Sequence, residues 1–534
     1  MNQRRREFLT TIAGAGTLLP MVSSRSFAAS SPIPIDVGRQ LFVDDYLIDE
    51  STLLKTFHKA TFHPNSPVLK PETPLELNNG VMPAAAPFGD GVWYDPKDKL
   101  FKIWYIGGYD DGFCYATSED GIRWNRPNLD VVPGTNRVMA PIRNYMRNGA
   151  SVWLDHHAKD PSERFKMFAY IQRGTGSWPR KQPDEPLPKG GRMASGYVYT
   201  SPDGIHWSKP TMTGGCGDNT SMFYNPFRKK WVFSIRKGRN GIGRARNFVE
   251  ADDFVKGAAW KPEDVNMWLS CDKRDRMDPV LKHRAELYKV DCVGYESRML
   301  GVFSVYLGPP NDIAYGQGFP KTNDLHAGFS RDGIDFERPD RSAFIACSRT
   351  PNTWNRGYLH PANGCCLVVG DQLRFYFAAF SGVSPAQGGG AFAGASTGMA
   401  TLRRDGFASV GSGSGIGTLT THGLTFKGKY MFVNADARSG ELRVEALDEG
   451  GRLLPGFSAA DCVPIKTDKT KIAVTWKGAS DLQSLIGRVV KFRFHLAGTD
   501  LYSFWVSPDE NGASHGYVGA GGPGFTGDTD TTGA

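Results

Sequence analysis

The chain has 534 residues, which is long for one domain, and its 40% hydrophobic and 22% charged residues are typical of a globular protein. The formal net charge is +8, of which the first 28 residues contribute +3 through four arginines and one glutamate. The remaining basic residues form no stripe, so nucleic-acid binding is not favoured. The 63 glycines and 34 prolines indicate many turns between short strands.

The N-terminus, MNQRRREFLTTIAGAGTLLPMVSSRSFAAS, is typical of a targeting segment. Residues 5–9 (RREFL) match the twin-arginine pattern, and a weakly apolar stretch and a small-residue exit follow. The apolar stretch is too short to span a bilayer comfortably. We therefore expect residues 1–29 to be a signal peptide, removed near Ala28 or Ala29. The mature protein is expected in the periplasm or outside the cell, with no membrane partner.

A short element recurs along the chain, as SEDGIRW (118–124), SPDGIHW (201–207) and SRDGIDF (330–336). Decayed copies place their Asp at 252 or 253 and at 405. An Asp side chain can accept hydrogen bonds from backbone amides, and Gly allows a positive φ, so Asp-Gly suits a tight turn. We predict that each copy, called a tag below, is a structural turn between the third and fourth strands of a unit.

The tags end five larger units that repeat one order of short, alternating strands. These units span 84–127, 148–210, 218–262, 285–339 and 360–410. Five four-strand units predict a five-bladed β-propeller over residues 30–410. The longer alternating strands after the linker GSGSGIGT predict a β-sandwich over 417–507, so the fold class is all-β. The Gly-rich residues 508–534 are expected to be disordered or a loose surface tail.

The eight cysteines show no spacing that is typical of a zinc site. We expect most of them to be buried free thiols. The sequence indicates no metal and no cofactor, and it does not indicate an oligomeric state.

Three segments carry a family resemblance: LFVDDYLIDE (41–50), GELRVEALDEGGRLLPGF (440–457) and DLYSFWV (500–506). Together with the tags, they resemble exported bacterial proteins similar to glycoside hydrolase family 32. The plan of five blades and a sandwich resembles families 32 and 43. This resemblance implies a glycosidase with a carbohydrate substrate.

The chain departs from family 32 at its catalytic motifs. The Trp-x-Asn-Asp-Pro-Asn-Gly segment and the Glu-Cys pair are missing, and RDRMDPV (274–280) carries Met277 inside the Arg-Asp-Pro motif. Specificity for sucrose or fructans therefore does not carry over.

Glycoside hydrolysis needs two carboxyl groups across the scissile bond. In a propeller, the starts of the innermost strands converge at one end of the central channel. The carboxylates near those starts are Glu76, Asp218 and Glu286. We predict that Asp218 and Glu286 are the catalytic pair, with Glu76 as a third candidate; a capped turn or a surface charge is the alternative for each.

Six further residues are candidates for substrate binding. Arg236 would pair with a carboxylate or donate to a hydroxyl, His360 and Asn363 would bind sugar hydroxyls, and Trp354 would stack on a sugar or pack in a loop. The other two are Asn148, at the start of the second unit, and Asp45, whose segment would close the ring or place a carboxylate near the axis.

Three other functions stay open. One is a carbohydrate-binding propeller without turnover. Another is a glycoside phosphorylase, which would need basic residues such as Arg147, Arg236 and Arg284 around a phosphate. The third is a sialidase-like enzyme, which the tag spacing and the lack of an arginine triad disfavour.

Overall fold

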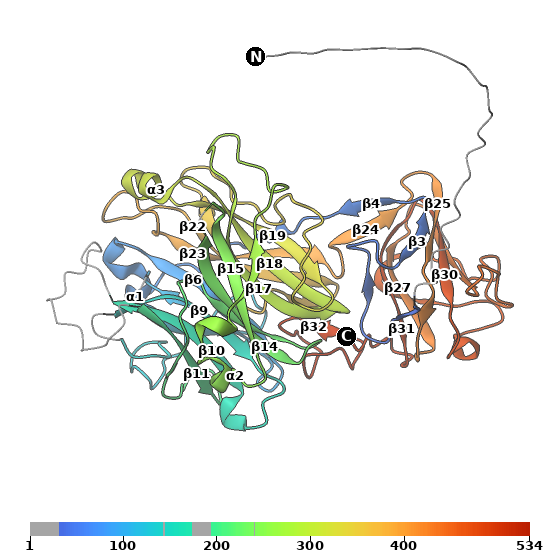
Figure 1. Cartoon of the computed structure of the whole chain (residues 1–534), viewed down its shortest axis with the longest axis horizontal. Helices are drawn as coiled ribbons and strands as arrows, with labels where there is room; N and C mark the ends of the chain where they lie inside the picture. Colours follow the sequence, from blue (N-terminus) through green and yellow to red (C-terminus); the bar gives the residue numbers. More distant parts are fainter. Residues whose placement is uncertain (1–30, 110, 142–144, 174–193, 240) are drawn as a thin grey trace, which may run out of the picture.

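The computed structural model describes residues 31–109, 111–141, 145–173, 194–239 and 241–534. The structure is 46% strand and 6% helix, so the all-β prediction is confirmed. Figure 1 shows a larger body that carries β6 to β23 and a smaller body that carries β24 to β31. The predicted signal peptide, residues 1–29, lies outside the described residues. Within them, no helix has the length and apolarity that a membrane span requires.

The first three repeat units of the larger body are antiparallel sheets. In unit one, an α-helix and a 3₁₀ helix come before three strands: α1 (Pro74–Leu77), η1 (Asn78–Gly80), β6 (Ala84–Asp95), β7 (Leu100–Gly107) and β8 (Gly112–Ser118). The elements of unit two are β9 (Tyr145–Leu154), η2 (Pro161–Glu163), β10 (Phe165–Arg173), β11 (Ala194–Ser201) and β12 (Thr211–Met212). Those of unit three are β13 (Ser221–Asn225), β14 (Lys230–Arg239), β15 (Gly243–Ala251), α2 (Phe254–Gly257), η3 (Pro262–Asp264) and β16 (Asn266–Ser270).

Units four and five draw on distant parts of the chain. Unit four consists of β17 (Glu286–Glu296), β18 (Arg298–Gly308), α3 (Asn311–Gln317) and β19 (Thr322–Ser330). Unit five consists of β20 (Gly357–Pro361), β21 (Leu367–Val369), β22 (Gln372–Phe380) and β23 (Ala395–Arg403), and β5 (Thr61–Phe62) pairs with its outer strand. β23 also pairs with β6, which joins units five and one into one sheet.

The predicted fourth strand is short in two units. In units one and four the expected short strand is only an isolated bridge, Thr117 to Asn125 and Phe329 to Glu337. The Pro residues just beyond these bridges, Pro127 and Pro339, cannot donate a backbone hydrogen bond to extend the pairing.

The tags are turns, as predicted. In the first tag, Asp120 Oδ1 accepts from the amides of Ile122 at 2.7 Å and Arg123 at 2.8 Å, and Ser118 Oγ accepts from the Gly121 amide at 2.8 Å. The tags at 203 and 332 repeat these bonds. Gly121 has φ +72°, which explains why glycine follows the Asp.

The antiparallel pairing gives the larger body two distinct ends. In each unit the first strand leaves one end, the second returns to it, and the third leaves it again and runs toward the tag. We call the end where first and third strands begin the site end, and the opposite end the tag end.

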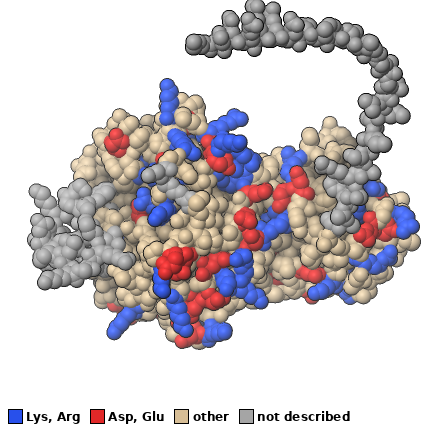
Figure 2. All heavy atoms as spheres, viewed as in Figure 1, with Lys and Arg blue, Asp and Glu red and all other residues tan. Residues whose placement is uncertain are grey.

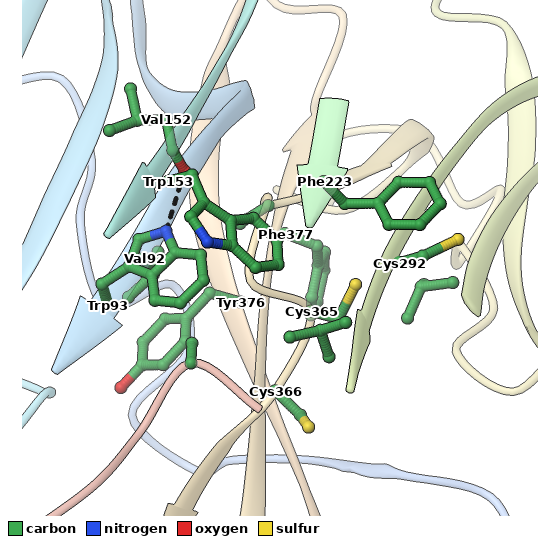
Figure 3. Packing of buried hydrophobic residues seen from close by; sticks show 14 of the residues in the cluster. Val92, Trp93, Val152, Trp153, Phe223, Cys292, Cys365, Cys366, Tyr376 and Phe377 are labelled. Carbon is green, nitrogen blue, oxygen red and sulfur yellow. Dashed lines mark hydrogen bonds between the residues drawn. The ribbon is translucent and has the colours of Figure 1, made fainter. Parts of the chain in front are cut away.

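The core of the larger body lies where neighbouring units meet. Figure 3 shows Trp93 of unit one against Trp153 of unit two, with ring centroids 4.6 Å apart. Trp93 Nε1 also donates to the carbonyl of Val152 at 2.8 Å, the dashed line in that figure. All eight cysteines are free thiols and all except Cys216 are buried, which confirms the prediction for most of them.

The smaller body contains two main antiparallel sheets around one hydrophobic cluster. The strands of the first are β2 (Gln40–Leu41), β4 (Leu54–Phe57), β24 (Ala408–Gly411), β27 (Tyr430–Asp436), β29 (Asp468–Val474) and β31 (Asp500–Ser507). The strands of the second are β3 (Ile48–Ser51), β25 (Ile416–Thr421), β28 (Glu441–Leu447) and β30 (Lys491–Ala497). A parallel pair, β1 (Ile33–Pro34) with β26 (Leu424–Thr425), and the 3₁₀ helix η4 (Gln483–Leu485) complete it.

The boundaries of the two bodies differ from the expected 30–410 and 417–507. Residues 33–57 and 408–411 pair within the sheets of the smaller body. Ile35, Phe42 and Leu47 bury their side chains in its core, so the segment gains more from these sheets than from the larger body.

The expectation of a disordered or loose tail was wrong. Residues 517 and 518 form β32 (Tyr517–Val518), which pairs with the end of β17. Ser514 Oγ donates to Glu296 Oε2 at 2.7 Å, and Arg404 binds Asp530 at 3.3 Å. The glycines permit this packing: a Cβ on Gly516 would collide with the Glu296 side chain. Backbone approach and polar anchors therefore hold a segment that has few apolar residues.

Candidate active site

Asp218 lies just before β13, at the site end of unit three. Its Oδ1 is 2.5 Å from Nη1 of Arg236, which lies on the neighbouring strand β14. The Asp218 side chain is 26% exposed and the Arg236 side chain 38% exposed, so both reach solvent. The structure therefore joins two of the predicted site residues in one ion pair.

Glu286 is the first residue of β17, and it also has an arginine partner. Arg244 Nη1 lies 2.6 Å from Glu286 Oε2, and the Arg244 amide donates to the same oxygen at 3.1 Å. Gly243 has φ +80°, and a Cβ there would come within 2.6 Å of the Glu286 carboxyl carbon. His283 Nε2 stands 3.8 Å from the other carboxylate oxygen. The start of β15 therefore leaves room for the Glu286 carboxylate, because residue 243 has no side chain.

Lys321 connects the two ion pairs. Burial lowers the pKa of Lys321 to about 7, and the charges of Arg244 and Arg236 act in the same direction, while Asp218 and Glu286 oppose them. Both predicted carboxylates therefore lie near one ammonium group. Asp218 and Glu286 both lie at the starts of first strands, at the site end of the neighbouring units three and four.

Aromatic rings surround this ammonium. Lys321 Nζ donates to the Tyr288 hydroxyl at 3.0 Å, and the hydroxyls of Tyr288 and Tyr358 lie 2.9 Å apart. Nζ lies 5.1–5.5 Å from four ring centroids, those of Tyr288, Tyr315, Tyr358 and Phe392. Arg244 stacks over Tyr306, 4.6 Å from its centroid. Aromatic rings of this kind also suit the apolar faces of sugars.

His360 and Asn363 lie inside the body rather than at its surface. His360 is fully buried, with its ring 4.4 Å from Phe88 and 4.5 Å from Tyr358. Burial, with Lys289 and Lys321 nearby, holds the pKa of His360 well below its ordinary value, so the ring is neutral. Asn363 is buried too, and its side-chain amide donates to the carbonyl of Met222 at 2.7 Å. Both positions favour packing beneath the site.

Glu76 has the contacts of a structural carboxylate. It is fully buried and closes a capping box at the start of α1, accepting from the amides of Glu72 and Thr73. Tyr105 OH and Arg126 Nε each donate to its Oε1 at 2.7 Å. These bonds use both carboxylate oxygens and favour a structural role.

Within the described part of the chain, the remaining three candidates make no hydrogen bond, ion pair or ring contact with Asp218 or Glu286, although Gly149, the neighbour of Asn148, lies against the backbone of Asn219. Trp354 packs against Phe377 with centroids 6.1 Å apart, in the outer part of unit five. Asp45 pairs with Lys55 of the smaller body. Asn148 is half-buried on β9.

A cleft of about 820 Å³ lies between residues 43–46, β16 and the third tag. Asp45 lines it, but Asp218, Glu286 and Lys321 do not. The cleft and the charged site are therefore separate places.

Arg244 and Lys321 were not among the predicted site residues, because the site was expected at the starts of first strands. Arg244 and Lys321 lie at the starts of third strands, which begin at the same end. Tyr288 and Tyr358 lie within two residues of the predicted Glu286 and His360. Extending the search to the third strands would have found both cations.

No protein-family model matches the chain, and no curated protein matches it either. Solved structures similar to it include an N-acetylgalactosamine deacetylase from F. plautii, at 14% identity over 65% of this chain and 96% of that one, with a TM-score of 0.42. A beta-1,2-mannobiose phosphorylase from Listeria innocua is 11% identical over 65% and 98%, with a TM-score of 0.39. A GH62 alpha-L-arabinofuranosidase catalytic domain from Coprinopsis cinerea is 11% identical over 65% and 97%, with a TM-score of 0.38. Likenesses this distant do not define a reaction.

Proposed function

We propose that this protein hydrolyses glycosidic bonds of a poly- or oligosaccharide, with Asp218 and Glu286 as its paired carboxylates. We also propose that its larger body is a five-bladed β-propeller and its smaller body a β-sandwich. The observation that carries the proposal is that two partly exposed carboxylates, each paired with an arginine, lie at the first-strand starts of neighbouring units, at the same end of the body.

The chemistry follows from the pairing. Glycoside hydrolysis needs one carboxyl group to protonate the leaving oxygen and another to attack the anomeric carbon or activate water. Asp218 and Glu286 are partly exposed and reach the same end of the body, as this division of work requires. The exposed ring of Tyr315 would supply an apolar contact to a sugar, whereas Tyr288 and Tyr306 are buried beneath the site.

The test is turnover of a glycan panel by the wild type and by Asp218→Asn and Glu286→Gln. Each substitution should lower kcat by about 10²- to 10⁴-fold, because positioned acid–base groups contribute that much. Asp335→Asn, an exposed carboxylate in the third tag, is the matched control and should change nothing. Full turnover by both site variants would exclude the pair. Binding of a glycan without turnover by the wild type would instead indicate a non-catalytic carbohydrate-binding protein.

Phosphorolysis at the same site is the second candidate. Arg236, Arg244 and Lys321 bring three cationic side chains to two carboxylates, and a phosphate co-substrate would use the excess. Turnover that requires inorganic phosphate and releases a sugar phosphate would favour this reaction over hydrolysis.

Export is part of the same proposal. The twin-arginine segment at residues 5–9 supports a periplasmic or extracellular location. Fractionation of cells that carry the intact chain or a twin-lysine variant of residues 5 and 6 would test it, because the variant should stay inside the cell.

A further inference from the structure

Lys321 is a buried lysine without a carboxylate partner. The residue is 2% exposed, and its ammonium makes one hydrogen bond, to the Tyr288 hydroxyl. Among the described residues, no Asp or Glu oxygen lies within the 4.0 Å of an ion pair with Lys321 Nζ. Two of its three N–H donors therefore have no hydrogen-bond acceptor among the described residues and have only aromatic rings around them.

Each of the other three buried lysines among the described residues is paired with a carboxylate. Lys102 is 2.7 Å from Asp95, Lys166 is 3.3 Å from Asp155, and Lys289 is 3.1 Å from Asp291. All three are as buried as Lys321. A buried ion costs several kcal/mol unless a counter-charge is present, which explains these three pairs. Lys321 lacks such a carboxylate and has one hydroxyl and four aromatic rings around its charge instead.

The charged groups around Lys321 do not balance its positive charge. The titratable and charged groups that face it come from five elements and one loop: Asp218, Arg236 of β14, Arg244 of β15, Glu286 and Tyr288 of β17, Tyr315 of α3, and Tyr358 and His360 of β20. His360 is neutral, so three cations meet two carboxylates, and each carboxylate is already bound by an arginine. On the face in Figure 2, by contrast, basic and acidic side chains are interspersed.

We propose that Lys321, with Arg236 and Arg244, binds an oxyanion of the ligand. The inference rests on the proposed function and names its substrate class: a glycan with a carboxylate or sulfate group, or a sugar that reacts with free phosphate. Arg236 and Arg244 are 38% and 16% exposed, against 2% for Lys321, so the two guanidinium groups would meet the anion first. Planar guanidinium groups suit these oxyanions because they donate two parallel hydrogen bonds.

The pH dependence of binding follows from the same geometry. The pKa of Lys321 in the empty site is about 7, so the ammonium is mostly charged at pH 6 and mostly neutral at pH 8.5. An anion favours the charged form and raises this pKa. A sugar acid whose own charge is constant over this range should therefore bind more weakly at pH 8.5.

The experiment measures binding by isothermal titration calorimetry at pH 6 and pH 8.5. The probes are glucuronate, galacturonate, glucose 6-sulfate and inorganic phosphate, with neutral glucose as the reference. We expect at least one oxyanion to bind at least tenfold more tightly than glucose at pH 6. A sugar acid that binds should lose at least threefold in affinity at pH 8.5.

Variants assign this effect to Lys321. Lys321→Met should lose at least tenfold in oxyanion affinity at pH 6, while the exposed Lys256→Met should bind like the wild type. Lys321→Arg keeps the charge and should retain most of the affinity. Glucose binding as tightly as every oxyanion, or unchanged oxyanion binding by Lys321→Met, would overturn the inference. The wild-type pH comparison stands without any variant, should Lys321→Met fail to fold.

Two further arms separate this inference from the proposed function. Asp218→Asn should keep or increase oxyanion affinity, since it removes a negative charge, even though turnover falls. Oxyanion binding without hydrolysis would support the oxyanion site and exclude the proposed hydrolase activity. Turnover of neutral glycans alone, without oxyanion binding, would support the hydrolase activity and exclude the oxyanion site. Turnover of acidic glycans without phosphate identifies the glycan as the source of the anion, and phosphate-dependent turnover identifies phosphate.

Discussion

Two charged clusters at opposite ends of the larger body differ in how their cations and carboxylates are paired. At the tag end, Arg39 and Arg404 lie among Glu296, Asp405 and Asp530, with side chains at most 2% exposed. Hydroxyl groups complete this network, since those of Tyr295, Ser503 and Ser514 donate to its carboxylates. At the site end, Lys321 has no acidic partner, and both ion pairs are open to solvent.

The difference indicates which charges serve stability and which serve binding. A buried network with cations, carboxylates and hydroxyl donors packed together compensates its own desolvation, and it fixes the smaller body against the larger one. A buried cation without a carboxylate partner lowers stability, and the proposed oxyanion would supply the missing counter-charge. Substitutions at the two ends should therefore have effects of opposite sign.

The largest effect is expected at the tag end. Arg39→Met leaves Glu296 and Asp405 buried with one cation fewer, and it should lower the free energy of unfolding by about 3–5 kcal/mol. Urea denaturation measures this change. The matched control is Arg228→Met, which breaks a surface pair with Glu250 and should cost about 0–1 kcal/mol. Equal effects of the two would contradict the structural role of the network.

Glu76→Gln tests the same distinction between structural and functional charges in unit one, where Glu76 is buried and paired with Arg126. The variant leaves Arg126 without its closest buried acceptor charge and should cost about 2–3 kcal/mol of unfolding free energy. Glycan turnover at a temperature well below unfolding should stay unchanged, in contrast to Asp218→Asn. A large loss of kcat at unchanged stability would place Glu76 in the catalytic machinery.

Lys321→Met should stabilise the empty protein by about 1–2 kcal/mol at pH 6, because it removes a buried charge. The pKa of Lys321 is about 7 in the folded state, below its ordinary value of 10.5. Between these two values the unfolded chain binds the proton more readily, so the wild type gains stability as pH rises. The wild type gains about 1.4 kcal/mol per pH unit above pH 7, so the advantage of the variant should shrink from pH 7 upward, disappear near about pH 8 and reverse by about pH 10. Thermal unfolding at pH 6, 8 and 10 measures it, and destabilisation at pH 6 would contradict an uncompensated charge.

The smallest effect is expected in a tag. Burial raises the pKa of Asp203, but hydrogen bonds from His206 and the amide of Ile205 outweigh it and lower the pKa to about 2. The carboxylate therefore stabilises the fold above pH 4, and this contribution is lost as the pH falls toward 2. Asp203→Ala should cost about 1 kcal/mol at pH 7 and less at pH 3, as unfolding curves would show. Asp335→Ala, on an exposed tag residue, should show neither change.

Local patterns in the sequence predicted the parts of the molecule that depend on neighbouring residues. The Ser-x-Asp-Gly spacing predicted the tag turns, because each turn is closed by bonds within five residues. The strand starts predicted that Asp218 and Glu286 would share one end.

Long-range partners could not be predicted in this way. Nothing local in residues 33–57 indicates pairing with strands beyond residue 407, and nothing in the Gly-rich tail indicates that its backbone packs on Glu296. The partners of a charge are equally hidden: the sequence shows Lys321, but only the structure shows that its acidic neighbours are bound to arginines.

The pairing of β4 with β24 makes the larger body an insertion within the smaller one. The chain leaves the smaller body at Phe57 and returns to it at Ala408, and these two residues are direct partners in the sheet. Entry and exit side by side are the geometry that allows one domain to be inserted into another. A fragment cut at residue 410 would therefore keep β2 and β3 but lose β31 and β25, leaving edge strands exposed to aggregation. Dissection of this protein should instead replace residues 58–407 with a short turn.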